Sequence, residues 1–357
     1  MKIKLAIDFG SANIKMLGNV NGVEKRGIVK SLANTKGLED TNNCVELYDR
    51  KVTFGSGYSL VKKDKTERDY VIETVFLATS KIYSKIGNEF EVELAIGLPL
   101  SIYKTESRLD YEEKLKNLYL NKKLSGKVNG EDLTLTIKFL KIYAEGYSGF
   151  LALYEEVSKD IPFLIVDIGY KTTDVLGIGR EIASDNLIIQ NYSSINKGMS
   201  EIFEDVKDHF FNDNKIEYDA QTIEYAVLTN QYLKIPTEEG NKNIDPKQWL
   251  KCGSEVVTDI FNDIETKLFP DMRTRNIYLI GGGVEIINRI LQQTNKYKDL
   301  EVEILINKEL SMFANVTGYY MQLERDLNRI QIIESNEAFV SDKKLDKSKK
   351  SVAITNE

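Results

Sequence analysis

Residues 7–15 read Ile7-Asp8-Phe9-Gly10-Ser11-Ala12-Asn13-Ile14-Lys15, and residues 166–174 read Val166-Asp167-Ile168-Gly169-Tyr170-Lys171-Thr172-Thr173-Asp174. In both stretches an apolar strand runs into an aspartate, which a glycine and small hydroxyl residues follow. The two aspartates lie 159 positions apart (8 and 167) in a chain of 357 residues. A repeat with this period predicts two similar halves that face each other across a cleft, each with a phosphate-binding turn.

Both turns have the composition of a phosphate-binding loop, because a glycine lets backbone N–H groups approach phosphate oxygens and hydroxyls add further donors. Either stretch alone could be an ordinary Asp-Gly turn that closes a strand, but two in matching context favour the phosphate sites. Neither is a Walker A loop, because the chain has no Gly-x-x-x-x-Gly-Lys-Ser/Thr string. The candidate phosphate ligands are Gly10, Ser11, Ala12, Asn13 and Lys15 in the first turn, and Gly169, Thr172 and Thr173 in the second.

Three carboxylates are candidates for binding Mg²⁺ or for activating an attacking water. Asp8 and Asp167 stand where hydrated Mg²⁺ or an attacking water would be held, because Mg²⁺ keeps several waters and prefers carboxylate contacts. Glu145 comes just before a predicted helix. It could cap that helix, since a negative charge is favoured at a helix N-terminus. Alternatively, it could orient and polarise the water that attacks a γ-phosphate, since phosphoryl transfer depends mainly on such positioning.

A third glycine site lies late in the chain. Gly281, Gly282 and Gly283 follow the apolar stretch Asn276–Ile280 and precede a predicted helix. Without side chains, this backbone could lie flat against a purine or its ribose. The triplet is not a dinucleotide fingerprint and is weak evidence by itself, but with the two turns it completes a nucleotide footprint.

Composition restricts the classes of function. The chain is 42% hydrophobic and 29% charged with a net charge of −7, which predicts a soluble globular protein of two domains or one bilobal unit. Interspersed charges of both signs argue against direct binding along DNA or RNA. Two distant cysteines and a single histidine argue against disulfides, cysteine zinc sites and histidine-dependent triads. We expect a cytoplasmic protein with no membrane span, since no stretch approaches the ~20 apolar residues required.

Hydrophobic periodicity predicts alternating strands and helices. The charged residues 60–70 are expected to be exposed, and the polar residues 213–250 to form a peripheral subdomain. After about residue 335 the periodicity fails, which predicts a charged, disordered tail over 336–357. The clearest strands are predicted at 91–97, 133–143, 163–166 and 276–280, and the clearest helices at 71–86, 107–120, 198–211 and 254–268.

Together these stretches resemble the actin/heat-shock-chaperone/sugar-kinase ATPase superfamily, and within it the ParM-type actin-like plasmid-segregation proteins of Gram-positive bacteria. The likeness spans roughly residues 1–330. It is carried by Asp8–Lys15 (phosphate-1), Gly97-Leu98-Pro99-Leu100, Glu145-Gly146-Tyr147-Ser148-Gly149 (first connecting helix), Asp167–Asp174 (phosphate-2), Ile280–Gly283 (adenosine) and Phe313–Gly318, which returns the chain to the first lobe.

The resemblance implies an α/β fold, the actin-like bilobal ATPase fold with two ribonuclease-H-like domains around a nucleotide cleft. Domain I would comprise residues 1–150 and about 318–335, with a peripheral subdomain at about 30–75. Domain II would comprise 151–317, with a peripheral subdomain at about 213–250.

The resemblance also implies roles for the candidate residues. Asp8 and Asp167 would coordinate Mg²⁺ and water, and Glu145 would activate water. Phosphates would be contacted by Ser11, Asn13, Lys15, Thr172 and Thr173, and the nucleoside by Gly281 and Gly282, with Gly283 beside them. Tyr170 and Lys171 depart from the small residues usual after the phosphate-2 glycine.

The leading hypothesis for function is a filament-forming actin-like ATPase or GTPase that uses Mg²⁺ and segregates plasmid DNA. By resemblance, its partners would be further copies of itself and a ParR-like DNA-binding adaptor, so that it contacts DNA only indirectly. One alternative is a small-molecule kinase of the same superfamily, although little surplus length is available for a substrate pocket. Another is a chaperone or reactivase ATPase, although the tail is too short for a substrate-binding domain.

Overall fold

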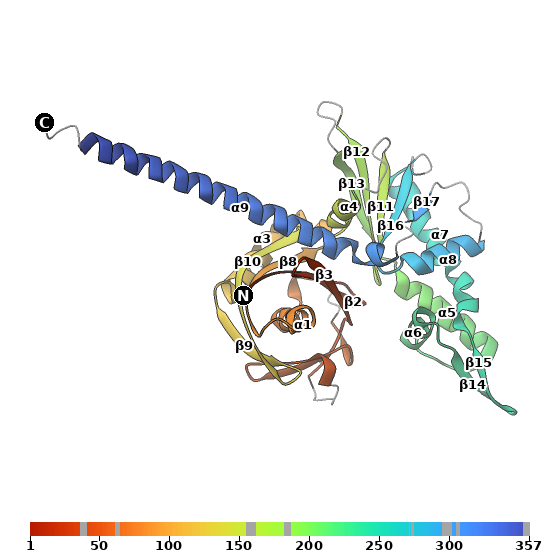
Figure 1. Cartoon of the computed structure of the whole chain (residues 1–357). Coiled ribbons are helices and arrows are strands. Elements are labelled where there is room, and N and C mark those ends of the chain that lie inside the picture. Colours follow the sequence, from red (N-terminus) through yellow and green to blue (C-terminus); the bar gives the residue numbers. More distant parts are fainter. Residues whose placement is uncertain are drawn as a thin grey trace.

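A computed structural model of the chain describes residues 1–35, 41–60, 65–154, 162–181, 187–270, 272, 275–294, 302–304 and 308–352. Two sheets organise these residues into two lobes, with two helices between them (Figure 1). None of the helices in the described part of the chain is long and apolar enough to cross a membrane.

The first lobe is a ten-stranded sheet in the order β3-β2-β1-β8-β10-β9-β5-β6-β4-β7. Figure 1 shows this sheet curling around α1 (Val71–Tyr83), which is buried on almost every side. A helix that is apolar all round is stable only inside a core. The strands are β1 (Lys2–Phe9), β2 (Asn13–Val20), β3 (Val23–Lys30), β4 (Leu32–Asn34), β5 (Cys44–Leu47), β6 (Arg50–Phe54), β7 (Tyr58–Ser59), β8 (Glu89–Leu98), β9 (Lys123–Val128) and β10 (Glu131–Ala144).

The second lobe is a five-stranded sheet in the order β13-β12-β11-β16-β17. Its strands are β11 (Phe163–Ile168), β12 (Thr173–Arg180), β13 (Leu187–Ile195), β16 (Asn276–Ile280) and β17 (Val302–Ile304). Helices cover it on the side that carries the hairpin of β14 (Leu233–Thr237) and β15 (Gly240–Ile244). These helices are α5 (Met199–Asn214), α6 (Ala220–Thr229), α7 (Ser254–Asp263) and α8 (Val284–Thr294).

The repeat seen in the sequence is a repeat of topology. β1 is antiparallel to β2 and parallel to β8, and β11 is likewise antiparallel to β12 and parallel to β16. Asp8 and Asp167 stand near the carboxyl ends of β1 and β11, the end at which open α/β sheets bind ligands. Each aspartate faces a cross-strand partner, which is Lys15 for Asp8 and Asp174 for Asp167.

The principal predicted elements are confirmed, with shifted ends. The helix predicted over 254–268 is α7 followed by a π-helical turn, Ile264–Leu268. The helix predicted over 107–120 is α3 (Glu106–Tyr119), which follows the short α2 (Leu100–Tyr103). The predicted strands at 91–97, 133–143, 163–166 and 276–280 correspond to β8, β10, β11 and β16.

Two helices connect the lobes. α4 (Tyr147–Leu153) packs its apolar side chains on the second sheet. α9 (Lys308–Val352) contacts both sheets: Ala314 packs on the second, and Val316, Tyr319 and Leu323 pack on the first. The helices cross so closely that a β-carbon at Gly318 would overlap with the carbonyl oxygen of Ser148. At the same crossing, Gln322 Nε2 donates a hydrogen bond of 2.7 Å to Ser148 Oγ.

The expectation of a disordered tail from residue 336 differs from the structure, in which α9 continues to Val352 and projects away from both lobes (Figure 1). Residues 336–352 contain no Gly or Pro and are rich in Lys. Such a segment can extend a helix that packing has already nucleated, because propagation costs much less than nucleation. Loss of hydrophobic periodicity therefore did not mark the end of the helix. Residues 353–357 of the predicted tail lie outside the described residues.

The close crossing of α4 and α9 predicts that Gly318→Ala destabilises the protein. The added methyl group has no space against backbone, and overpacking of this kind costs about 1–3 kcal/mol in free energy of unfolding. Urea unfolding followed by circular dichroism measures the change. Asn328→Ala, at an exposed position of the same helix, is the matched control. A Gly318→Ala variant as stable as wild type would contradict the crossing geometry.

Candidate active site

The two turns predicted to bind phosphate meet at one cavity of about 370 Å³ between the lobes. Gly10–Asn13 and Lys15 line it from the first lobe, and Gly169, Gly282 and Gly283 line it from the second. Its other walls are largely apolar, with a few charged side chains, a composition typical of small-molecule sites. These walls include Ile28, Lys30, Tyr170, Met199, Phe203, Glu224, Tyr225, Leu228, Glu285, Ile286 and Met312.

The first turn joins β1 to β2 and is held by backbone and hydroxyl contacts. A β-carbon at Gly10 would lie 2.6 Å from the carbonyl oxygen of Asn13, so only glycine fits there. Ser31 donates from its hydroxyl to the carbonyl oxygen of Gly10 and from its backbone N–H to that of Ala12, the latter over 2.8 Å. Ser31 was not predicted from the sequence, since a lone serine after a strand carries no recognisable signal.

The second turn closes in the same way, despite Tyr170 and Lys171. The N–H of Gly169 donates to the carbonyl oxygen of Thr172 over 2.9 Å. Thr173 is fully buried, and its hydroxyl donates to the carbonyl oxygen of Lys197 over 2.9 Å. Neither Thr172 nor Thr173 lines the cavity, so in this part of the described chain Gly169 and Tyr170 form its surface.

The triple glycine brings the loop after β16 against the second turn. Gly281 has a φ of 96°, and a β-carbon there would overlap with Asp167 Oδ1. The N–H of Gly283 donates to the carbonyl oxygen of Ile168 over 3.1 Å. Gly282 alone has open space where a side chain would be, and it faces the cavity. Thus Gly281 and Gly283 are required for packing, and Gly282 exposes its backbone to the cavity.

Asp8 and Asp167 do not line the cavity themselves. They are buried two residues before Gly10 and Gly169, at what we call the base of the site, and they lie close to other charges. Lys15 Nζ lies 3.2 Å from Asp8 Oδ2, and both side chains are buried. Burial, with the nearby Asp174 carboxylate and a smaller contribution from Asp8, raises the pKa of Asp167 to about 7, although Lys15 and Asn315 oppose the shift. Burial also raises the pKa of Asp174. The two halves of the repeat are therefore electrostatically coupled.

Asn315, on α9, connects Asp167 to the loop that carries Glu145. Its Nδ2 donates a 2.6 Å hydrogen bond to Asp167 Oδ2, and its Oδ1 accepts one of 2.9 Å from the N–H of Gly146. The sequence places Asn315 in the element that returns the chain to the first lobe, but it does not predict these bonds. They form between residues more than 140 positions apart.

Glu145 does not cap α4, so the capping alternative is wrong. The N-cap is Gly146, and no side chain caps the helix. Instead, Glu145 Oε2 accepts a 2.7 Å hydrogen bond from Lys65 Nζ, and Glu145 Oε1 lies 3.7 Å from Arg68 Nη2. Glu145 is buried, and Arg68 is nearly so.

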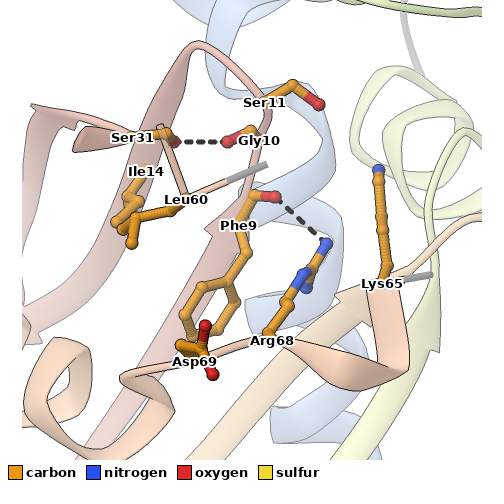
Figure 2. A pocket seen from close by; sticks show the side chains of 9 residues that line it. All are labelled: Phe9, Gly10, Ser11, Ile14, Ser31, Leu60, Lys65, Arg68 and Asp69. Atoms are coloured by element: carbon orange, nitrogen blue, oxygen red, sulfur yellow. Dashed lines mark hydrogen bonds between the residues drawn. The ribbon is translucent and has the colours of Figure 1, made fainter. Parts of the chain in front are cut away.

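Lys65 and Arg68 correct the expectation that residues 60–70 are simply exposed. Figure 2 shows both beside the first turn, with Arg68 reaching the carbonyl oxygen of Phe9 at the end of β1, a bond of 3.1 Å. The Arg68 guanidinium also lies 5.0 Å from the centre of the Phe9 ring. A charged run usually indicates a solvated surface, and nothing in its composition shows that two of its cations turn inward. Residues 61–64 lie outside the described residues.

Lys30, Glu224 and Tyr225 also line the cavity and were not predicted. Lys30 Nζ, on β3, lies 4.9 Å from the centre of the Tyr225 ring on α6, so it reaches from one lobe to the other. Burial raises the pKa of Glu224, and Lys30 opposes that shift. The polar composition of 213–250 gave no signal that α6 would face the cavity.

Mg²⁺ fits the donor set at the base of the site, behind the turns that line the cavity. Within the described residues, no group of three or more His, Cys, Asp or Glu side chains is arranged as a metal site. Two buried carboxylates, Asp8 and Asp167, are nevertheless present, and burial together with the charge of Asp174 raises the pKa of Asp167. Mg²⁺ suits such a site because it keeps most of its waters and takes further oxygens from bound phosphates.

Two family models match the chain. The N-terminal domain model of actin-like proteins matches residues 6–147, and the C-terminal model of the archaeal MreB-like actin homologue matches residues 165–293. This chain is an actin-like protein. The first match covers most of the ten-stranded sheet, and the second covers most of the five-stranded sheet. The fold class predicted from the sequence is confirmed. A search of curated protein sequences finds no match.

Solved structures share the actin-like fold at low sequence identity. The actin-like protein Alp7A is 14% identical, with a TM-score of 0.68 over 94% of this chain and 100% of its own. An archaeal actin homologue in complex with ADP is 17% identical, with a TM-score of 0.67 over 90% of this chain and 99% of its own. A ParM from a 15-stranded filament of Clostridium botulinum is 17% identical, with a TM-score of 0.65 over 91% of this chain and 99% of its own.

The raised pKa of Asp167 predicts that Asp167→Asn stabilises the nucleotide-free protein at neutral pH. Because the folded state holds its proton more tightly than an unfolded Asp, the ionised carboxylate destabilises the fold as pH rises from about 4 to about 7. The stability gain of the variant over wild type should grow across that window to roughly 2–4 kcal/mol. Urea unfolding at several pH values measures it.

The matched control for this prediction is Asp132→Asn, which changes an exposed carboxylate far from the cavity. A gain for Asp167→Asn that is constant with pH would contradict the assigned direction of the shift.

Proposed function

We propose that this actin-like protein binds a purine nucleoside triphosphate with Mg²⁺, assembles into filaments and hydrolyses the nucleotide. The observation that carries this proposal is the convergence of the turns at Gly10–Asn13 and Gly169–Tyr170 with Gly282 on one cavity between two lobes. A ligand that touches both lobes stabilises their closed arrangement, because it binds that state more tightly than an open one.

The nucleotide would lie with its phosphates at the two turns and its nucleoside along Gly282 and the apolar wall of Met199 and Phe203. The archaeal homologue of the same fold binds ADP, which supports a nucleotide in this cavity. Either ATP or GTP satisfies the features described. Asp8 and Asp167 would hold Mg²⁺ through its waters, and the ion would neutralise charge on the β- and γ-phosphates.

Other side chains would contact the phosphates and activate the attacking water. Lys15, which is paired with Asp8, would contact phosphate oxygens. The backbone N–H groups of the first turn would add further hydrogen-bond donors. Glu145 would orient the attacking water and accept its proton as the new bond to the γ-phosphorus forms and the bond to the bridging oxygen breaks. Lys65 and Arg68 hold the Glu145 carboxylate in place.

Filament formation is proposed from the fold and from the 15-stranded ParM filament among the structures that share it. An acidic chain of net charge −7 is not suited to bind DNA directly. We therefore infer that plasmid segregation would require a DNA-bound adaptor of the ParR type, in the cytoplasm.

The test is right-angle light scattering of the purified protein at tens of micromolar, with Mg²⁺ and either ATP or GTP, followed by electron microscopy. We expect scattering that rises with nucleotide and falls as phosphate is released. A protein that binds nucleotide and remains monomeric would refute the filament. Phosphoryl transfer to a sugar panel without filaments would instead identify a small-molecule kinase.

Glu145→Gln should slow nucleotide hydrolysis by about a hundredfold or more, a typical value for loss of a general base. Nucleotide affinity and filament assembly should persist, because the amide keeps the size of the side chain, and filaments should live longer. Phosphate release and light scattering measure the two effects.

The matched control is Glu73→Gln, at a buried carboxylate on α1 outside the cavity, which should leave hydrolysis near the wild-type rate. Wild-type turnover in Glu145→Gln would remove Glu145 from the chemistry.

A further inference from the structure

Tyr319 lies one helical turn after Asn315 on α9, and residues four apart share a face of a helix. Its ring packs into the core of the first lobe and stacks on Tyr143, with ring centres 6.5 Å apart. Its hydroxyl reaches the end of β8, where a β-carbon at Gly97 would overlap with it. This explains why a glycine stands at position 97 in an otherwise bulky, buried strand.

The Tyr319 hydroxyl is at the base of the candidate active site. Gly97 lies between Tyr143 on β10 and the end of β1, so Asp8 and Glu145 follow on the neighbouring strands. Arg68 Nη1 donates to the carbonyl oxygen of Gly97 over 3.2 Å. Burial, and then the negative charges of Asp8, Glu145 and Asp167, raise the pKa of Tyr319 far above its ordinary value, so the phenol carries its proton.

This hydroxyl is fully buried, yet it has no hydrogen-bond partner among the described residues. Glu145 Oε1 is also buried and lacks a hydrogen bond, although Arg68 lies 3.7 Å away. An unpaired buried donor is costly and uncommon, and it requires an explanation. The stacked neighbour Tyr143 provides a contrast, because its hydroxyl donates to Asp326 Oδ2 over 3.0 Å. A phenylalanine at position 319 would fill the core equally well without the unpaired group.

We propose that Tyr319 is a positioning residue for hydrolysis, whose hydroxyl donates a hydrogen bond to the attacking water while Glu145 Oε1 accepts one from it. A water between these two oxygens would satisfy both. The inference rests on the proposed nucleotide hydrolysis. It adds a neutral donor from α9 that restricts the orientation of the water, a contribution that the carboxylates alone cannot make because they only accept.

The test compares Tyr319→Phe with wild type in phosphate release, in affinity for ADP and in affinity for ADP with aluminium fluoride, which mimics the transferring phosphoryl group and its water. We expect kcat to fall about tenfold, the effect of losing one hydrogen bond, with KM and ADP affinity unchanged. Affinity for the aluminium fluoride complex should fall by a similar factor. The melting temperature should be unchanged or higher, since a buried unpaired group is removed.

The matched control is Tyr143→Phe, which removes the hydroxyl of the stacked ring outside the site and should leave kcat and aluminium fluoride affinity unchanged. If the wild-type protein hydrolyses nucleotide and Tyr319→Phe has the same kcat, this inference is overturned while the proposed function stands. A wild-type protein that hydrolyses neither ATP nor GTP would contradict the proposed function, and the inference with it.

A fall in ADP affinity equal to the fall in kcat would also overturn the inference, because it would show that Tyr319 supports the cavity as a whole. Gly97→Ala provides a second route, since it displaces the hydroxyl while keeping the tyrosine. It should reproduce the loss of aluminium fluoride affinity, and wild-type affinity in that variant would count against the assignment.

Discussion

The amide of Asn315 links three parts of the molecule that are distant in sequence. It donates to Asp167 at the end of the second sheet and accepts from Gly146 at the start of α4, while its backbone belongs to α9. A buried amide has to satisfy both its donor and its acceptor, and it can do so only in a narrow range of positions. The relative placement of Asp167 and the Glu145 loop therefore depends on where α9 crosses α4. That crossing requires glycine at position 318, because the helices meet backbone to backbone.

The site that results is crowded with acidic groups. Asp8, Asp167, Asp174 and Glu145 come from both lobes. Burial raises the pKa of Asp167 first, and the negative charges of Asp174 and Asp8 raise it further. Lys15, Lys65 and Arg68 offset part of this charge. Uncompensated buried charge lowers stability and is typical of functional sites. A bound cation would reduce this uncompensated charge.

The two halves of the repeat are not equivalent. Asp8 faces Lys15 across its hairpin, whereas Asp167 faces Asp174. In the first half a cation offsets the charge of the aspartate, and in the second half two carboxylates face each other. The same strand topology thus gives the two aspartates different electrostatic environments, and the difference arises from a single cross-strand position.

By itself, the sequence determined the repeat, its strand–turn pattern, the acidic and glycine residues of the site and the family resemblance. These follow from local rules: an apolar strand that ends at Asp-Gly looks the same wherever it occurs in a fold. Only the tertiary structure decided that Lys65 and Arg68 turn inward to Glu145, and that Thr173 donates to Lys197 and does not line the cavity. It also placed Asn315 and Tyr319 among the carboxylates. These contacts join residues far apart in the chain, and their energies come from burial and charge, which no local pattern in the sequence encodes.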